Sequence, residues 1–245
     1  MINADPERTP YDLHFRLFNI PVRVHPFFWV IAVLLGIRGS EADPIEMLLW
    51  VAAVFVSILV HELGHALAAR SNGFQPWITL HAFGGLASFQ GEPRSLGNRL
   101  FITFAGPLAG FAFAALIVAG IALSGQQIAL VPDLMPVRFE FYASPHLNIL
   151  LYDLLFINIL WGLINLLPVY PLDGGQISRE LFLQASPYDG IRQSLILSII
   201  TGAAIAAYAL LVAGSFYLAL LFGYMAYMSY ATLQAYQGRG GGRGW

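Results

Sequence analysis

The stretch LVHELGHALAAR, residues 59–70, closes an apolar segment that begins near Ile45, and it carries two histidines and a glutamate. Ionisable side chains are costly at membrane depth, so they are rare there and mark functional sites. In a helix, His61 and His65 lie on one face, about 6 Å apart, and two imidazoles at this spacing can bind one zinc ion. Glu62 lies beside that face, where it can reach a water on the metal without being a ligand. The alternative is that the pattern arose by chance.

The composition is that of a membrane protein. Of the 245 residues, 58% are hydrophobic and 11% are charged, compared with about 25% charged in an ordinary soluble domain. The mean hydropathy is +0.67. The chain has no cysteine, which excludes disulfides, thiolate ligands and cysteine nucleophiles. A bound metal must therefore use His, Asp or Glu, and the absence of a basic run excludes nucleic acid as an expected partner.

The hydropathy pattern predicts an all-α polytopic membrane protein with about six transmembrane helices. The first segment is marginal because only residues 26–37 are uninterruptedly apolar, whereas a span takes about 20 residues. We expect one intramembrane domain over residues 1–237 and a flexible Gly/Arg tail over residues 238–245. The six expected spans are residues 24–40, 45–69, 100–124, 147–167, 191–213 and 215–235.

The arginines predict the orientation of these spans. Ten of them fall on the N-terminal side of the predicted topology, and only Arg38 and Arg138 fall on the other side. Cytoplasmic loops are enriched in basic residues, so both termini are predicted to be cytoplasmic. We expect an integral protein of the bacterial inner membrane. Because Arg70 follows His61 by nine residues, about 13 Å of helix, the metal would lie within the bilayer near its cytoplasmic face.

Two histidines leave a catalytic zinc one protein ligand short. The best candidate for the third is Asp173, in the segment INLLPVYPLDGGQI, residues 164–177. Pro168 and Pro171 are expected to break the fourth helix there, on the side where the histidines lie. A loop with a capping aspartate is the alternative. Other acids fit less well: Glu92, Glu180 and Asp189 resemble solvated loop charges, and Asp133, Glu140 and Asp153 lie toward the opposite face.

Together, HELGH in the second span and NLLPVYPLDGG, residues 165–175, in the fourth resemble the two motifs of the site-2 protease family of intramembrane zinc metalloproteases, HExxH and N-x-x-P-x-x-x-L-D-G. The resemblance implies one zinc ion per chain, held by His61, His65 and Asp173. It implies that Glu62 is the general base and acid and that Asn165 polarises the scissile carbonyl or holds the substrate. The chain departs from the family at Gly110, where many members have asparagine.

The segment WITLHAFGGLASFQ, residues 77–90, is too short to span as a helix. It predicts a β-hairpin that turns at Gly84 and Gly85 and resembles the re-entrant β-loop of the family. An exposed edge of this hairpin could pair with an extended substrate, or the hairpin could be purely structural. His81 is expected to be an ordinary hairpin residue, because a fourth protein ligand would leave no position for water.

The remaining polar residues have structural explanations at this stage. His14, His25 and His146 fall outside apolar segments or at their ends and are expected to be interfacial. Asn158 and Asn165 are seven residues apart on the fourth span. Hydrogen bonding between helices is the expected role of Asn158, whereas the motif favours a catalytic role for Asn165.

The sequence therefore predicts an intramembrane zinc endopeptidase that cleaves single-span membrane proteins in or near their transmembrane segments, with the lipid bilayer as its environment. One alternative is a membrane zincin that acts on soluble or lipidated peptides and has a glutamate as its third ligand. Another is a catalytically inactive membrane-protein binder, or a transporter that uses the polar cluster as an ion site. The lack of a matching second half with paired broken helices disfavours a transporter.

Overall fold

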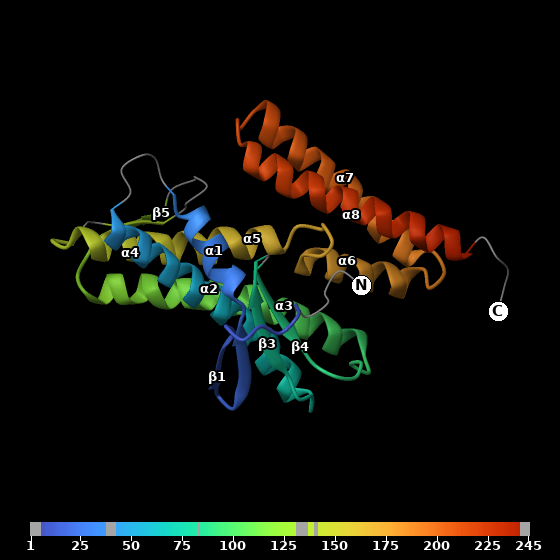
Figure 1. Cartoon of the computed structure of the whole chain (residues 1–245), viewed down its shortest axis with the longest axis horizontal. Coiled ribbons are helices and arrows are strands. Elements are labelled where there is room, and N and C mark those ends of the chain that lie inside the picture. The colour runs from blue at the N-terminus through green and yellow to red at the C-terminus, as the bar shows by residue number, and fades with distance from the viewer. Residues whose placement is uncertain (1–5, 38–42, 83, 131–136, 140–141, 241–245) are drawn as a thin grey trace. The chain divides into compact units, whose positions relative to one another are not determined.

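The structure is a computed structural model that describes residues 6–37, 43–82, 84–130, 137–139 and 142–240 (Figure 1). Asp133 and Glu140, set aside above as ligands, lie outside the described residues, as do Arg38 and residues 241–245 of the predicted tail. The chain forms two compact units. One comprises Met1–Pro93 with Phe104–Leu163, and the other comprises Arg94–Thr103 with Ile164–Trp245.

Two hairpins in the first unit form a four-stranded sheet with the order β1-β2-β3-β4 (Figure 1). Strands β1 and β2 are antiparallel, β2 and β3 are parallel, and β3 and β4 are antiparallel. The β1–β2 hairpin was not predicted. The buried residues Ile20, Val22, Val24, Ile78 and Leu80 of β2 and β3 join the core that lies against α2. The strands are β1 (Leu13–Leu17), β2 (Ile20–Val24), β3 (Trp77–His81) and β4 (Gly84–Ser88).

The predicted hairpin forms between β3 and β4, but its predicted turn is wrong. Gly84 and Gly85 are the first two residues of β4, where they pair with His81 and Leu80, so these two glycines do not form the turn. The contact of Gly85 with α2, described below, explains why glycine is needed within the strand. Sequence pattern alone does not separate a glycine that turns from one that allows a close approach.

Five helices are long and apolar enough to cross a membrane, and they coincide with the second to sixth predicted spans. Helices α2 (Pro44–Ser71) and α3 (Leu96–Leu123) are continuous. The fourth span was predicted as one helix, but it consists of α4 (Pro145–Phe156), the π-helical segment η1 (Ile157–Trp161) and α5 (Gly162–Asn165). A short strand pair, β5 (Ile128–Leu130) and β6 (Val137–Phe139), lies between α3 and α4 in sequence and was not predicted.

Strand β2 and helix α1 together run the length of α2. Helix α1 (Pro26–Leu35) has ten residues, about 15 Å, and is too short to span alone. At one end of α2, Arg70 donates a hydrogen bond to the carbonyl oxygen of Phe18, before β2. At the other end, Trp50 Nε1 donates to the carbonyl oxygen of Ala32 in α1 at 3.0 Å. Residues 18–32 therefore run antiparallel to α2. Of the first predicted span, residues 24–40, the structure shows a helix only over Pro26–Leu35, and strand β2 precedes it.

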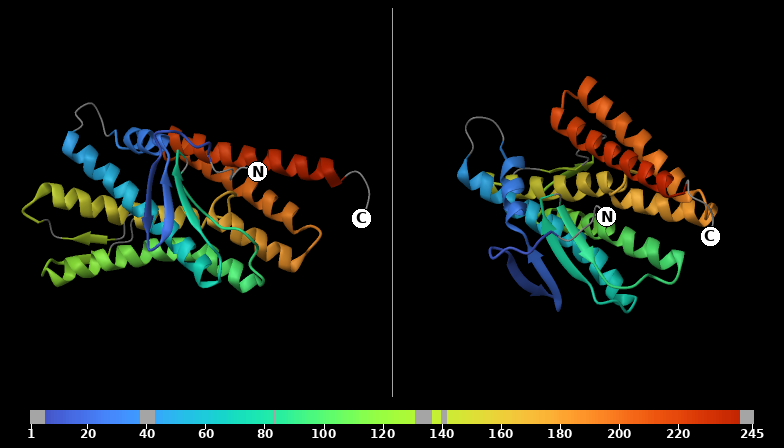
Figure 2. Two further views of the ribbon diagram at one scale, coloured as in Figure 1. Left: turned by 60° about the horizontal axis from the view of Figure 1, so that its bottom comes forward. Right: turned by 45° about the vertical axis from the view of Figure 1, so that its right-hand side comes forward.

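The second unit contains an unpredicted helix and a helical hairpin. Helix α6 (Asp173–Ala185) begins at the aspartate that the sequence indicates as a ligand. Helices α7 (Gly190–Leu211) and α8 (Phe216–Gly240) pack side by side, as both views in Figure 2 show. Their core includes Phe222, against Val169 and Leu172 of the loop that precedes α6. The loop and α6 are thereby supported by α7 and α8.

A buried ion pair fixes the N-terminal segment to the sheet. Arg23 of β2 donates to Asp12 Oδ2 at 3.0 Å and to the carbonyl oxygen of Pro6 at 2.8 Å. Burial opposes ionisation of Asp12, but hydrogen bonds from Thr9 and Arg23 outweigh it and lower the pKa of Asp12 to about 2. The carboxylate is therefore ionised at neutral pH and holds residues 6–12 against β2.

Candidate metal centre

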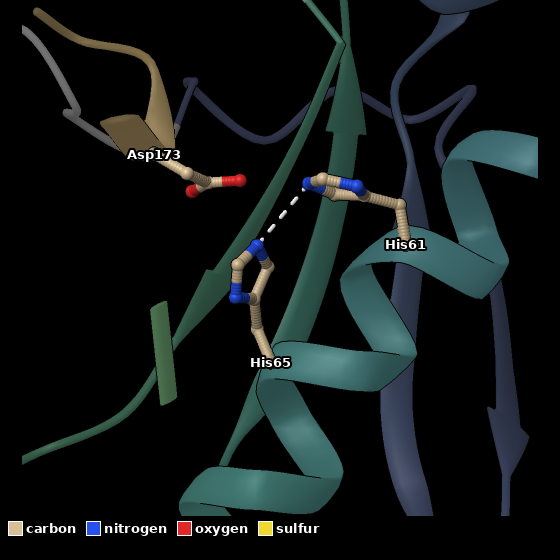
Figure 3. A group of neighbouring side chains, drawn as sticks. All are labelled: His61, His65 and Asp173. Carbon is tan, nitrogen blue, oxygen red and sulfur yellow. Dashed lines mark hydrogen bonds between the residues drawn. The ribbon is translucent and has the colours of Figure 1, made fainter. Parts of the chain in front are cut away.

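The two histidines of the HELGH motif lie together in the structure. His61 and His65 occupy successive turns of α2, and Figure 3 shows their rings turned toward one another. Their Nε2 atoms are 3.2 Å apart and the ring planes are 78° apart. His61 is buried and His65 is half-buried. The imidazoles are thus arranged around a common point within the apolar core.

This geometry fits zinc. Two nitrogens at 2.0–2.1 Å from a tetrahedral zinc ion are about 3.3 Å apart, and the observed Nε2 separation is 3.2 Å. Each ring can offer its Nε2 to one ion without a change of helix geometry. Imidazole nitrogens are also among the ligands that zinc commonly binds in proteins.

Glycines from two neighbouring elements allow the backbone to approach this turn of α2. A Cβ atom at Gly64 would lie 2.2 Å from the carbonyl oxygen of Ala105 in α3. A Cβ atom at Gly106 would lie 2.1 Å from Nε2 of His65. Helices α2 and α3 therefore pack closely only because both positions lack a side chain. Gly106 leaves the space in which the His65 ring lies.

Strand β4 touches the predicted general base. Glu62 is 6% exposed, and a Cβ atom at Gly85 would lie 2.2 Å from its Cγ and 2.5 Å from its Oε1. The Glu62 side chain is thus packed directly against the backbone of the outer strand of the sheet. The sequence identified Glu62, but it did not identify Gly85. The only signal for this contact was a pair of glycines that is equally typical of a turn.

Asn158 forms the interhelical hydrogen bond predicted for it. Its Nδ2 donates at 2.8 Å to Ser57 Oγ, one turn before His61 on α2, and at 2.8 Å to the carbonyl oxygen of Leu154. Because a carbonyl oxygen only accepts, this contact fixes which end of the amide is the donor. Asn158 lies in η1, and a Cβ atom at Gly110 would be 3.5 Å from its Oδ1. The amide therefore holds η1 against α2 beside Gly110 of α3.

The other histidines of the first unit have separate positions. His25 caps α1, with its Nδ1 accepting from the backbone N–H of Phe27 at 3.2 Å. His81 ends β3 and is half-buried. His14 lies on β1, and its Nδ1 is 3.0 Å from the carbonyl oxygen of Asp12. His146 is near Asp43 at 3.8 Å. Of these, His25 is buried rather than interfacial, because it is used as a helix cap.

In the second unit, Asp173 is the first residue of α6, and its side chain is drawn in Figure 3. It is 7% exposed, at the end of the helix where the helix dipole favours a carboxylate. A Cβ atom at Gly174 would lie 2.1 Å from the carbonyl oxygen of Leu166, and one at Gly175 would lie 2.5 Å from the backbone nitrogen of Tyr170. The Pro-rich loop thus folds directly over the first turn of α6. This explains the two glycines that follow Asp173.

Hydrogen bonds fix that loop to both helices of the hairpin. The backbone N–H of Tyr170 donates to Ser198 Oγ of α7 at 3.1 Å, and Ser229 Oγ of α8 donates to the carbonyl oxygen of Tyr170 at 3.5 Å. Asn165, the other motif residue of this unit, ends α5 and is 7% exposed. The break predicted after the fourth span is present, and Asp173 follows it on a rigid helix rather than on a free loop.

Comparison with known proteins defines the class. A sequence model of peptidase family M50 matches residues 49–144 and 138–207. The chain is 29% identical over 176 residues to a zinc metalloprotease of Methanocaldococcus jannaschii, covering 71% of this chain and 46% of the relative. It is 30% identical over 176 residues to the stage IV sporulation protein FB of Bacillus subtilis, covering 69% of this chain and 50% of the relative. The chain thus spans about half the length of these relatives.

A solved structure shares the fold. The site-2 protease from Methanocaldococcus jannaschii matches with a TM-score of 0.60 and 22% identity, over 91% of this chain and 95% of that chain. The apolar helices and the histidine motif define an integral membrane protein of the zinc metalloprotease class. Within that class, the chain belongs to peptidase family M50, the site-2 protease family.

The Gly106 contact predicts a loss of metal affinity on a minimal substitution. In Gly106→Ala the new methyl group and Nε2 of His65 cannot both keep their positions, so the ring must move. We expect zinc affinity to fall at least tenfold, the size of effect seen when the support of a metal ligand is lost. Zinc content after dialysis against a graded chelator measures it. Gly110→Ala, with its Cβ atom 3.5 Å from the nearest atom of Asn158, is the matched control and should retain zinc. Equal zinc affinity in both variants would contradict the packing argument.

Gly85→Ala should separate proton transfer from metal binding. The methyl group would displace the Glu62 carboxylate while leaving the histidines unchanged. We expect zinc content to remain normal and peptide hydrolysis to fall tenfold or more, a change of about 1.4 kcal/mol in the barrier. Gly97→Ala, whose Cβ atom would meet only Ser95 Oγ at 3.9 Å, should leave both unchanged. Normal cleavage by Gly85→Ala would show that this contact does not position Glu62.

Proposed function

We propose that the protein is an intramembrane zinc endopeptidase that hydrolyses peptide bonds in or near the transmembrane segments of single-span membrane proteins. The observation that carries this is the His61–His65 pair on an apolar helix, with Nε2 atoms at a separation that suits zinc and the buried Glu62 on the same turn of that helix. Membership of peptidase family M50 supports the reaction class. The alternative of an inactive binder has no support from the site, since the His-Glu-His set is intact.

In this proposal Asp173 is the third ligand of one zinc ion held with His61 and His65. Each of the three side chains offers one ligand atom, an imidazole nitrogen or a carboxylate oxygen. Asp173 is buried at the start of a helix whose first turn and preceding loop are tightly packed. Such a fixed carboxylate loses little freedom on binding a metal. This favours aspartate over the glutamate ligand of other membrane zincins.

Individual residues of the chain are proposed to have separate roles in hydrolysis. A bound zinc ion supplies Lewis acidity that activates water at neutral pH and polarises the scissile carbonyl. The Glu62 carboxylate accepts the proton of the attacking water and then donates it to the leaving amine. Packing against Gly85 restricts the rotamers of Glu62, so its carboxylate is held ready for proton transfer. Asn165 is proposed to donate a hydrogen bond to the oxygen on which charge develops.

Strand β4 is proposed to hold the unwound substrate. A helix hides its peptide bonds in its own hydrogen bonds, so cleavage requires a locally extended chain that can be stabilised by pairing. In the sheet, β3 is paired on both sides, whereas β4 is an outer strand. The edge of the predicted hairpin that a substrate could pair with is therefore the edge of β4 and not that of β3. The outer strand also touches Glu62 through Gly85, so a strand added there would lie beside the base.

The topology is proposed to place both termini and the metal on the cytoplasmic side of a bacterial inner membrane. The arginine distribution supports it, as does the antiparallel course of residues 18–32 along α2, which adds a sixth crossing to the five long helices. An even number of crossings brings the two termini to one side.

Two substitutions test the metalloprotease proposal. Glu62→Gln should retain zinc and lose cleavage of a single-span substrate by at least a hundredfold, because an amide cannot accept the proton. Asp173→Ala should lose zinc to an extent comparable with His65→Ala, since each removes one of three ligands. Metal analysis and a cleavage assay in bilayer nanodiscs measure both effects. Full activity in Glu62→Gln would overturn the mechanism, and full zinc content in Asp173→Ala would assign the third ligand to another residue.

The edge-strand proposal makes a position-specific prediction. In a two-residue hairpin His81 and Gly84 form a hydrogen-bonded pair, so Gly85 and Ala87 direct their N–H groups away from β3. Ala87→Pro removes an outward donor while sparing the β3–β4 ladder, and cleavage should fall about tenfold with zinc retained. Ala87→Ser keeps the N–H and is the control. A substrate already extended by prolines near its cleavage site should be less affected. Equal activity of the Pro and Ser variants would leave the hairpin with only a structural role.

A further inference from the structure

The connection between β1 and β2 is a strained turn with a large aromatic residue at its tip. Leu17 pairs with Ile20, and the two residues between them, Phe18 and Asn19, have φ angles of 48° and 64°. Two consecutive positive φ angles define a turn that favours Asn-Gly, and a bulky residue such as phenylalanine is an outlier there. The Phe18 side chain packs into no core and is 65% exposed. The strain at Phe18 is therefore not offset by burial within the protein.

Two guanidinium groups surround this tip. Arg70 donates to the carbonyl oxygen of Phe18, and Arg16 Nη1 donates to Asn19 Oδ1 at 3.4 Å. Both arginines are exposed. Among the residues that the structure describes, the ion pairs do not include Arg16 or Arg70. The nearby Asp12 carboxylate is paired with Arg23 instead. The tip thus presents one exposed aromatic ring and two cations to its surroundings.

Helix α2 indicates the depth at which the tip lies. Glu46 and Arg70 are 24 residues apart, and Glu62 is the only Asp, Glu or Arg residue between them. At 1.5 Å per residue this is about 36 Å, slightly more than the roughly 30 Å of a hydrocarbon core. Arg70 therefore lies at the membrane–water interface. Because it is bonded to Phe18, the tip lies at the same level.

We propose that the β1–β2 tip, residues 16–19 with Arg70, is a lipid-binding anchor. The Phe18 ring enters the boundary between headgroups and acyl chains, and Arg16 and Arg70 bind the phosphates of anionic lipids. Aromatic rings are favoured at this boundary, and guanidinium groups bind phosphate oxygens by charge-assisted hydrogen bonds. Contact with lipid accounts for an exposed phenylalanine at a strained position, which a water-facing turn would fill with asparagine or glycine.

The anchor bears on the proposed substrate strand. Strand β2 pairs with β3, β3 pairs with β4, and β4 contacts Glu62 through Gly85. A hairpin held by lipid at one edge of this sheet fixes the height of the opposite edge in the bilayer. This consequence rests on the proposed function, but the lipid contact itself does not.

The absence of cysteine allows a direct measurement of depth. Pro21 is exposed and lies opposite Arg16 in the β1–β2 register, so a nitroxide on Pro21→Cys is the single label and leaves Phe18 intact. Its collision rates with oxygen, which concentrates in lipid, and with a water-soluble nickel chelate are measured in nanodiscs containing anionic phosphatidylglycerol. Leu116→Cys, 70% exposed on α3, and Glu92→Cys, in an exposed loop, give the lipid and water references.

We expect an oxygen-to-nickel ratio for the Pro21 label between the two references. Phe18→Ser should shift the ratio at least twofold toward the Glu92 reference, whereas Phe18→Trp should leave it unchanged. The ratio should be higher with phosphatidylglycerol in the nanodiscs than without it, and Arg16→Gln should reduce this difference, since only Arg70 then remains to bind the phosphates. A Pro21 label as accessible to nickel as the Glu92 label, or an unchanged ratio in Phe18→Ser with normal helicity, would overturn the proposal. None of these readouts requires cleavage, so failure of the anchor is distinguishable from failure of the protease assignment.

Discussion

The close approach of backbone to one helical turn of α2 is the constraint on which the rest of the first unit depends. Ionisable groups at membrane depth need protein around them, because lipid offers no hydrogen bonds. Here protein atoms reach His65 and Glu62 only because Gly106 and Gly85 have no side chain, and α3 reaches α2 only because Gly64 has none. Each glycine comes from a different element: α2, α3 or β4. The packing of these three elements is therefore matched to the volumes of two side chains, His65 and Glu62.

The breaks in the fourth span are also held in place by other parts of the protein. The fourth span does not run as one helix; η1 turns Asn158 toward Ser57, one turn from His61, and π segments of this kind are frequent at functional sites. The span is followed by a loop that is hydrogen-bonded to Ser198 of α7 and Ser229 of α8. Asp173 then begins a new helix instead of ending an old one. The irregular backbone that follows the fourth span is thus held by side-chain hydrogen bonds from both helices of the hairpin.

The candidate site residues could be singled out from the sequence because they are ionisable groups within apolar segments. His61, Glu62, His65 and Asp173 stand out in apolar segments, and their spacing carries chemical meaning. The second to sixth spans were predicted for the same reason, since a long apolar helix has a strong signal. Helix α6 was missed because it is short and amphipathic and directly follows a Pro-rich break. The role of Gly85 was missed because a glycine in a strand has no pattern that reveals what lies opposite it.

The β1–β2 hairpin shows a further limit of sequence patterns. Its strands are five residues each, and the residues at its turn, Phe18 and Asn19, do not form the Asn-Gly pair typical of a two-residue hairpin. The parallel pairing of β2 with β3 joins segments about 55 residues apart, so no local signal could have revealed the four-stranded sheet. Once the sheet is known, the unusual turn gains a meaning. A residue that conflicts with its local structure indicates a role other than stabilising the fold. In a protein surrounded by lipid, an exposed aromatic ring between two arginines suits the membrane interface better than water.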